Sequence, residues 1–395
     1  MDVSISPLFD TYEVELYRFM QIGQVVRQPA GYSAFIPGLF PPPDLKLSES
    51  TQLSLESANL KLGRLDGVTE LIPDLDFFIS MYVLKESALS SQVEGTRATM
   101  TDALRAESDI RIGLPDDVDD ILRHINAMNE GLQLLKELPL SLRLIRNVHE
   151  VLMTGGRSHG HITPGLFRTS QNWIGGATIN SARYVPPPPY EMMRALGDLE
   201  SFLHRDDDLP KLIKAGLAHA QFETIHPFLD GNGRTGRLLV TFYLCSQNVL
   251  TKPVLYLSEF FKQQRELYFD LLHSYHDQGN VEGWLEFFLE GIATVSDQAI
   301  LTARRIIDVR AHDLEQIALL GRRSENGMLL LKALYKSPIL TVNRATKLTG
   351  LSRANANALV NKLVELGIIE AVAPDATYNR QFVHQRYLTL FTEEA

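Results

Sequence analysis

The spacing of hydrophobic positions predicts a chain built mostly of helices. Residues 116–136 carry one apolar stripe, formed by Val118, Ile121, Leu122, Ile125, Met128, Leu132 and Leu135. That three-to-four-residue spacing is typical of a helix with one buried face. Comparable patterns predict helices over residues 142–153, 190–205, 211–225, 238–247, 267–275 and 281–305. The expected fold class is therefore mainly α.

The C-terminal tail has a different pattern. Residues 329–335, 342–349 and 352–366 predict three short helices, with Ser352 as an N-cap. Two short β-prone runs follow, 367–370 and 382–387, joined by a polar turn. This order predicts a winged helix-turn-helix.

A long stretch between the helices lacks helical spacing. Residues 155–189 are rich in Gly, Pro, Ser and Asn and end in four consecutive prolines. A loop of this length is often functional rather than a mere connection.

Composition excludes several classes of protein. The 395 residues are 45% hydrophobic and 22% charged, with one cysteine, so a disordered chain and a disulfide-stapled scaffold are both excluded. The first ten residues lack the features of a signal peptide, and no run is long enough to cross a membrane. We expect a soluble, cytoplasmic protein. Its net charge of −10 disfavours nonspecific binding to nucleic acid or anionic membranes.

One twelve-residue segment, residues 226–237, carries an unusual concentration of chemistry. Its sequence is HPFLDGNGRTGR. The Asp-Gly and Asn-Gly pairs permit a turn that aims backbone N–H groups to one side, and a helix is expected directly after it. Arg234 and Arg237 are three residues apart and can face one ligand. This pattern predicts a polyphosphate site, with Asp230 suited to Mg²⁺ and His226 placed to act as a general base.

The segment differs from two common glycine-rich motifs. It contains a literal G-x-G-x-x-G, but a helical pattern precedes it, so a dinucleotide fold is rejected. A Walker A loop is rejected because no Lys-Ser/Thr follows the glycines. The remaining alternative is an ordinary helix–loop–helix turn with solvated arginines.

The segment resembles the Fic family motif, H-P-F-x-[DE]-G-N-G-R-x-x-R, and matches it completely. The resemblance implies a Fic-type helical core with a small β-hairpin flap, and AMP transfer from ATP to protein hydroxyls. His226 would accept the hydroxyl proton, and Asp230 would hold Mg²⁺ against the phosphates. The residues expected to bind the nucleotide are Gly231, Asn232, Gly233, Arg234, Thr235, Gly236 and Arg237. Relatives that phosphorylate carry Lys at the position of Gly233, so the resemblance favours a protein adenylyltransferase.

A second, shorter motif lies near Gly95, after a helical pattern. Ser90, Glu94 and Gly95 resemble the family's inhibitory motif, [ST]-x-x-x-E-[GN]. In the subclass with an N-terminal inhibitory helix, this glutamate pairs with the second arginine of the active-site motif, here Arg237. The resemblance therefore implies autoinhibition, whereas an ordinary solvated glutamate is the alternative reading.

Two further regions look family-like. The segment containing Tyr184 and Val185 resembles the flap that docks a target by strand addition, and a rigid Pro-rich connection is the alternative. Tyr268 is expected near the adenine, although tyrosines at such spacing are commonly core residues.

The tail supports a function of another class. Residues 325–395 hold eight Lys/Arg and six Asp/Glu, against an acidic remainder. The polar residues that could face DNA are Asn343, Arg344, Ser352, Arg353, Asn355 and Asn357. The alternative to an enzyme is a DNA-binding transcriptional regulator with a nucleotide-sensing Fic domain.

The sequence thus predicts three regions. Residues 1–115 form an N-terminal, mostly helical region with the inhibitory helix, residues 116–310 the Fic core, and residues 311–395 the winged helix. The expected ligands are ATP and Mg²⁺. The expected partners are an unidentified target protein and this protein itself as acceptor, with a homodimer and DNA as open alternatives and no membrane.

Overall fold

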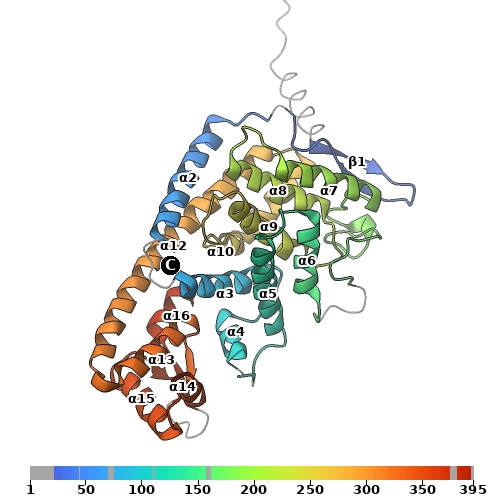
Figure 1. Ribbon diagram of the computed structural model, residues 1–395. Helices are drawn as coiled ribbons and strands as arrows, with labels where there is room; N and C mark the ends of the chain where they lie inside the picture. The colour runs from blue at the N-terminus through green and yellow to red at the C-terminus, as the bar shows by residue number, and fades with distance from the viewer. Residues whose placement is uncertain are drawn as a thin grey trace, which may run out of the picture. The chain divides into compact units, whose positions relative to one another are not determined.

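The computed structural model describes residues 22–43, 45–69, 75–108, 110–111, 113–156, 162–373 and 380–392. Helices dominate this part of the chain (Figure 1). They are α2 (Glu49–Thr69), α3 (Leu75–Val93), α4 (Met100–Glu107), α5 (Val118–Leu134), α6 (Leu142–Met153), α7 (Pro189–His204), α8 (Lys211–Ile225), α9 (Asn232–Ser246), α10 (Ser258–Gln263), α11 (Arg265–Asp277), α12 (Val281–Ala318), α13 (Ser324–Lys336), α14 (Val342–Thr349), α15 (Arg353–Glu365) and α16 (Gln385–Thr392).

The mainly α fold class is confirmed. Helices α6, α8 and α14 begin and end at the residues that the hydrophobic pattern predicts. The described residues between α6 and α7 contain only one short 3-10 helix, Ile179–Ser181, as expected for a long loop. None of the helices in the described ranges is long and apolar enough to span a bilayer. The first ten residues, on which the signal-peptide prediction rests, lie outside the described ranges.

Several predicted element bounds are wrong. Helix α12 continues to Ala318 instead of ending at residue 305, and α13 begins at Ser324 instead of residue 329. Helix α9 begins at Asn232, inside the glycine-rich motif, rather than after it. Gly231 adopts a left-handed backbone (φ 78°) that glycine tolerates, and the chain turns into the helix directly behind it. The second β-prone run of the tail ends at Val383, and Gln385 already belongs to α16.

The structure contains a hairpin that the pattern did not predict. Strands β1 (Gly23–Arg27) and β2 (Ser33–Pro37) pair antiparallel, with Val25 opposite Phe35. The Phe35 N–H also donates to the Val185 carbonyl at 2.9 Å. The hairpin therefore anchors the end of the long loop that precedes α7.

The contacts divide the chain into two compact units. The first comprises residues 1–62, 123–251 and 257–294, and the second comprises residues 63–122, 252–256 and 295–395. The chain passes between the units several times, so neither is one continuous segment. The three-region division at residues 115 and 310 stays a prediction.

The core of the first unit surrounds α8. Nearly every residue of α8 is buried, because small residues such as Ala215, Gly216 and Ala218 let neighbouring helices approach closely. Helices α7, α9 and α11 pack against it. Trp284 of α12 lies fully buried beside it and donates its indole N–H to the Gly216 carbonyl at 2.8 Å. This packing fixes the end of α8, where the candidate site begins.

The second unit contains the winged helix. Strands β3 (Ile339–Thr341), β4 (Glu370–Ala371) and β5 (Gln381–Val383) form an antiparallel sheet in the order β3–β5–β4. Helices α13, α14 and α15 accompany this sheet, which is the arrangement expected from the sequence. The polar turn at residues 374–379 lies outside the described residues. Helix α3 packs against α13 and α16 in this unit.

Candidate functional site

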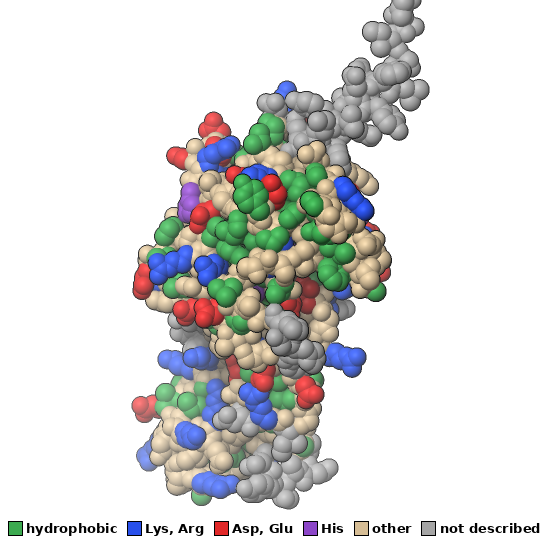
Figure 2. Space-filling view, turned by 90° about the vertical axis from the view of Figure 1, so that its right-hand side faces the viewer, with side chains coloured by type: hydrophobic (Ala, Val, Ile, Leu, Met, Phe, Trp, Pro, Cys, Tyr) green, Lys and Arg blue, Asp and Glu red, His purple; other side chains and the backbone are tan. Residues whose placement is uncertain are grey.

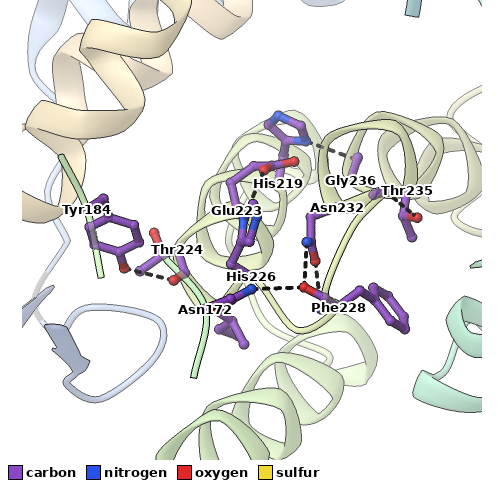
Figure 3. Close-up of polar contacts among 12 residues, drawn as sticks. Asn172, Tyr184, His219, Glu223, Thr224, His226, Phe228, Asn232, Thr235 and Gly236 are labelled. Atoms are coloured by element: carbon purple, nitrogen blue, oxygen red, sulfur yellow. Dashed lines mark hydrogen bonds and ion pairs between the residues drawn. The ribbon is translucent and has the colours of Figure 1, made fainter. Parts of the chain in front are cut away.

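The site is built around His226, at the end of α8. Its backbone is left-handed (φ 49°, ψ 61°), and Pro227 prevents the helix from continuing. The side chain is 20% exposed, and its Nδ1 lies 4.0 Å from Glu223 Oε2 on the preceding turn (Figure 3). A carboxylate at this distance can stabilise the positive charge that a histidine gains when it accepts a proton.

A buried arginine holds the backbone of this turn. Arg168 is 2% exposed, and its Nε donates to the His226 carbonyl at 2.9 Å. Its remaining guanidinium N–H groups donate to carbonyls of Ile225, Pro187 and Ser170. The carbonyls at a helix end have no intrahelical partner, so Arg168 satisfies part of the C-terminus of α8. Burial lowers the pKa of Arg168 to about 10, which leaves the guanidinium charged at neutral pH.

The loop after Pro227 is locked by an amide. Asn232 is 2% exposed, and its Oδ1 accepts from the Phe228 N–H at 2.8 Å while its Nδ2 donates to the Phe228 carbonyl at 2.9 Å. Asn172 donates to the same carbonyl at 3.0 Å (Figure 3). The loop is thus held in one shape by bonds from both of its sides. A fixed loop keeps the N–H groups that follow it oriented toward a ligand.

The N-terminus of α9 provides the features of an anion site. The first N–H groups of a helix have no intrahelical partner and carry partial positive charge. Gly231 precedes them, and a Cβ added there would lie 2.7 Å from Met153 Sδ, so only glycine fits. Arg234 lies one turn into the helix, 3.9 Å from Asp230, and Arg237 is 3% exposed. Backbone dipole and both arginines therefore gather in six residues, as the sequence predicts.

Two buried histidines flank these arginines in the neutral form. His149 Nδ1 accepts the Gly165 N–H at 2.9 Å, so the ring proton is on Nε2, which donates to the Asp230 carbonyl at 3.0 Å. Its ring stacks on Phe228, with centroids 3.6 Å apart. Burial lowers the pKa of His149 to about 4. Burial, helped by Arg237 and Arg234, also lowers the pKa of His124 well below its usual value.

Asp230 is the candidate magnesium ligand. Its side chain is 48% exposed, and Oδ1 accepts the Gly231 N–H at 2.6 Å. A carboxylate oxygen at the mouth of a phosphate site is the donor that Mg²⁺ prefers. The exposed carboxylate beside the α9 N-terminus fits a partly hydrated ion shared with phosphate oxygens.

Gly236 and Thr235 support the site from inside. Thr235 donates its hydroxyl to the Gly231 carbonyl at 2.8 Å, and the Gly236 carbonyl bonds His219 Nδ1 at 2.9 Å. A Cβ at Gly236 would overlap Glu223 Oε1, so glycine leaves room for the carboxylate beside His226. Gly233 lies in the first turn of α9 and is partly exposed.

Tyr268 lies in the core of the first unit. It is 1% exposed, its hydroxyl bonds His219 Nε2 at 2.9 Å, and its ring stacks on Phe261 at 4.5 Å. Through His219 it is connected to the Gly236 carbonyl. In this arrangement it supports the motif from behind, and its placement near an adenine stays a prediction.

Tyr184 and Val185 lie at the base of the long loop. Tyr184 is 7% exposed and donates its hydroxyl to the Thr224 carbonyl at 2.8 Å (Figure 3). Its N–H and carbonyl both bond Ile174, and the Val185 carbonyl accepts from Phe35. These backbone groups are therefore already in use, and target docking by this segment stays a prediction.

The inhibitory motif belongs to the second unit. Ser90 is fully buried in the last turn of α3, which ends at Val93. Glu94 and Gly95 follow in an exposed turn, with Gly95 at φ 97°. The expected helix end before Gly95 is confirmed. The pairing of Glu94 with Arg237 stays a prediction.

Sequence reasoning did not assign the positioning roles that three residues of the candidate site have: Arg168, His149 and Glu223. Arg168 and His149 act on backbone groups far along the chain, and no local pattern marks them. Glu223 could have been found, because it lies one helical turn before His226 and so shares its face.

Two family models match this chain. Residues 139–244 match the Fic/DOC family model, and residues 53–133 match the model of the Fic/DOC family N-terminal region. Residues 139–244 are therefore a Fic/DOC family domain. The Fic domain includes the whole segment from His226 to Arg237.

The relatives of this Fic domain are distant. The protein adenylyltransferase Fic of Drosophila grimshawi is 30% identical over 178 residues, which is 44% of this chain and 32% of that protein. The chain thus spans about a third of the length of that curated relative. A Fic family protein from Desulfovibrio desulfuricans G20 has the same fold, with a TM-score of 0.57, 20% identity and coverage of 87% of this chain and 98% of that one.

A second solved structure has a similar fold. A Fic domain-containing signaling protein from Bacteroides thetaiotaomicron matches with a TM-score of 0.51 and 22% identity, covering 64% of this chain and 97% of that one. These two likenesses show the fold.

Proposed function

We propose that this protein transfers AMP from ATP to Ser, Thr or Tyr hydroxyls of target proteins, itself included. The observation that carries the proposal is the juxtaposition of His226 with the N-terminus of α9, six residues further along the chain. The first unit therefore offers a proton acceptor next to a phosphate cradle. The distant relation to a protein named adenylyltransferase supports the same chemistry.

The proposed reaction assigns a role to each group. The hydroxyl oxygen attacks the α-phosphorus, a new O–P bond forms, and the bond to the β-phosphate oxygen breaks to release pyrophosphate. The hydroxyl proton passes to His226, whose imidazolium Glu223 stabilises. Arg234, Arg237 and the α9 N–H groups hold the phosphates and stabilise the developing charge. Asp230 would hold Mg²⁺, which neutralises phosphate charge when bound.

An apolar surface beside the site supports a protein acceptor. Trp173 and Ile174 are 43% and 37% exposed, and the neighbouring Asn172 bonds the Phe228 carbonyl of the loop. Leu229 in the loop itself is 36% exposed. Figure 2 shows that exposed hydrophobic side chains lie among polar ones on the face that it draws. Grouped exposed apolar side chains are typical of protein-binding surfaces.

Label transfer tests the proposal. Wild type, His226→Ala and His204→Ala would each be incubated with α-labelled ATP, Mg²⁺ and a cell lysate. His204 is an exposed histidine at the end of α7 and serves as the matched control. We expect labelled protein bands with wild type and His204→Ala, and none with His226→Ala. ATP binding without label transfer, both by wild type and by Glu94→Gly, in which the restraint proposed below is removed, would overturn the proposal.

We further propose that Glu94 restrains this activity. The support is its position directly after α3, in the motif that resembles the family's inhibitory one. A carboxylate that competes with the γ-phosphate for Arg237 would block productive ATP binding. We expect Glu94→Gly to raise label transfer at least tenfold, while Glu130→Gln, at an exposed glutamate of α5, leaves it unchanged. Equal activity of Glu94→Gly and wild type would show that Glu94 is no inhibitor.

DNA binding by the winged helix is a second candidate function. Arg353 and Asn355 are exposed in the first turn of α15, which Ser352 caps. One guanidinium nitrogen of Arg344, Nη1, already donates to the Ser337 hydroxyl and the Ile339 carbonyl. Fluorescence anisotropy with a DNA duplex at two salt concentrations tests this role. A DNA binder shows a steep salt slope that Arg353→Ala reduces. The cytoplasmic location and the homodimer remain predictions.

A further inference from the structure

A cluster of metal-ligating side chains lies on α11, outside the nucleotide site. His273, His276 and Asp277 each place one ligand atom within 4.8 Å of the others. The Asp277 carboxylate contacts both rings, Oδ2 with His273 Nε2 at 2.8 Å and Oδ1 with His276 Nδ1 at 2.8 Å. His276 and Asp277 lie three and four residues after His273, so each of them can face His273 across one turn of the helix.

This donor set matches a transition-metal ion. Two imidazoles and one carboxylate are ligands that zinc and related divalent ions accept, with bonds of about 2.0–2.2 Å. Mg²⁺ prefers oxygen donors, so the set differs in kind from the Asp230 site. Small side-chain rotations would replace the carboxylate–imidazole contacts by bonds to one shared ion. The exposed sides of His273 (29%) and Asp277 (40%) leave an entry path and room for a water ligand.

The neighbouring residues hold the His276 ring in place, and the positive charge of Arg183 lies close enough to repel a bound ion. His276 is 7% exposed on its side chain, stacks on Tyr184 with centroids 3.9 Å apart, and touches Phe35. Arg183 is the nearby cation, and it forms an ion pair with Asp270 at 2.5 Å. That pairing reduces its repulsion of a bound ion.

We propose that His273, His276 and Asp277 form a binding site for a divalent transition-metal ion of the zinc class. The site lies next to the base of the long loop, because His276 stacks on Tyr184. A bound ion would fix the His276 ring and with it Tyr184, whose hydroxyl bonds the Thr224 carbonyl two residues before His226. The ion would therefore stiffen the loop beside the candidate active site.

Cobalt spectroscopy tests the proposal on the untagged full-length chain. Metal-stripped protein would be titrated with Co²⁺ alone, followed by Zn²⁺ in competition and by excess Mg²⁺. We expect one equivalent of Co²⁺ with visible absorption bands, displaced by Zn²⁺ and retained in Mg²⁺. His273→Ala and Asp277→Asn should each weaken binding at least tenfold. Both substitutions are at partly exposed positions, and circular dichroism would verify that the variants are folded.

Two control variants separate this site from others. His204→Ala removes an exposed histidine on α7, and Asp230→Ala removes the candidate magnesium ligand. Both should bind Co²⁺ as wild type does. Absence of binding by wild type, or equal binding by the folded His273→Ala variant, would overturn the proposal. Label transfer is not the readout, so the result is independent of the proposed AMP transfer.

Discussion

Arg168 donates from Nε to the carbonyl of His226 at 2.9 Å, although the two residues are 58 positions apart. The same guanidinium also donates to the carbonyl of Pro187, just before α7, and to the carbonyl of Ile225, the last residue of α8. The turn that presents His226 is therefore held by one buried side chain from the long loop. The geometry of the candidate base depends on a residue outside the family motif.

Replacing Arg168 tests this dependence. Arg168→Met keeps much of the apolar stem but leaves the carbonyls of His226 and Pro187 buried without their donor. We expect a loss of about 3 kcal/mol in the free energy of unfolding, because unsatisfied buried polar groups are costly. Urea denaturation measures it. Arg205→Met, at a 55% exposed arginine paired with Asp207, is the control and should cost less than about 1 kcal/mol. Equal losses in the two variants would contradict the assigned role.

We predict that the absence of a side chain at Gly236 lets the Glu223 carboxylate stay beside His226. In Gly236→Ala the new methyl group meets Glu223 Oε1 and lies 3.1 Å from Phe222 Cδ1, so the carboxylate must turn away from His226. We expect kcat for label transfer to fall roughly ten- to a hundredfold with ATP affinity little changed, since misplaced catalytic groups reduce rate. Gly197→Ala is the matched control, because open space surrounds its Cβ position in α7. It should keep full activity and gain about 0.5–1 kcal/mol of stability.

The neutral state of His149 makes stability depend on pH. Its pKa is about 4 in the folded chain against an ordinary value of 6.5, so the unfolded chain binds more protons between these values. The contribution of neutral His149 to the free energy of unfolding is fully present above pH 6.5 and is lost as the pH falls from 6.5 to 4. It amounts to roughly 3 kcal/mol.

Urea midpoints of wild type and His149→Gln measure this contribution. Glutamine does not titrate, so the variant should lose less stability than wild type between pH 7.5 and pH 4.5. Parallel pH profiles would show that His149 is not kept neutral by the fold. His219, whose pKa burial also lowers to about 4, titrates in both chains and cancels in the comparison.

A buried polar cluster is predicted to hold the winged helix to α12. Asp313 Oδ2 accepts from the Tyr335 hydroxyl at 2.6 Å and contacts His384 Nε2 at 2.6 Å, and both His384 and Asp313 are fully buried. Asp313→Ala leaves these two groups unpaired, so we expect a loss of about 3–5 kcal/mol. Asp308→Ala, at an exposed position of the same helix, should change stability by less than about 0.5 kcal/mol. Thermal unfolding of both variants makes the comparison.

The elements that the sequence predicts well have strong local signals at their ends. Helix α6 starts after Ser141, whose hydroxyl accepts the Leu144 N–H, and α8 ends before Pro227. The start of α9 was missed because Gly231 and Gly233 suggest a turn, whereas tertiary packing extends the helix through Gly233. The β1–β2 hairpin was missed because its pairing gains support from Val185, far along the chain.

The residues of the candidate site also fall into two groups, those with a local sequence signal and those that act from far along the chain. The sequence alone could suggest Asp230, Arg234 and Arg237 as ligand-binding residues, because they are close together in the chain and their side chains have charges suited to phosphate and Mg²⁺. The groups that position them were not, since His149 acts on Asp230 across 81 positions. The place of Tyr268 near an adenine stays a prediction, and the partner of its hydroxyl, His219, is one that no spacing indicates.

The placement of α3 has a consequence for how the protein can be dissected. Helix α3 carries Ser90 in its last turn, and it packs on α13 and α16, where Tyr82 meets Phe391 edge to face at 5.5 Å. The helix that leads to Glu94 is therefore part of the cooperative folding unit of the C-terminal tail. A chain truncated before α13 would release α3 together with the tail. If such a truncation raised AMP transfer, the gain would come from the loosened α3 and Glu94, and would be no evidence that the winged helix itself inhibits.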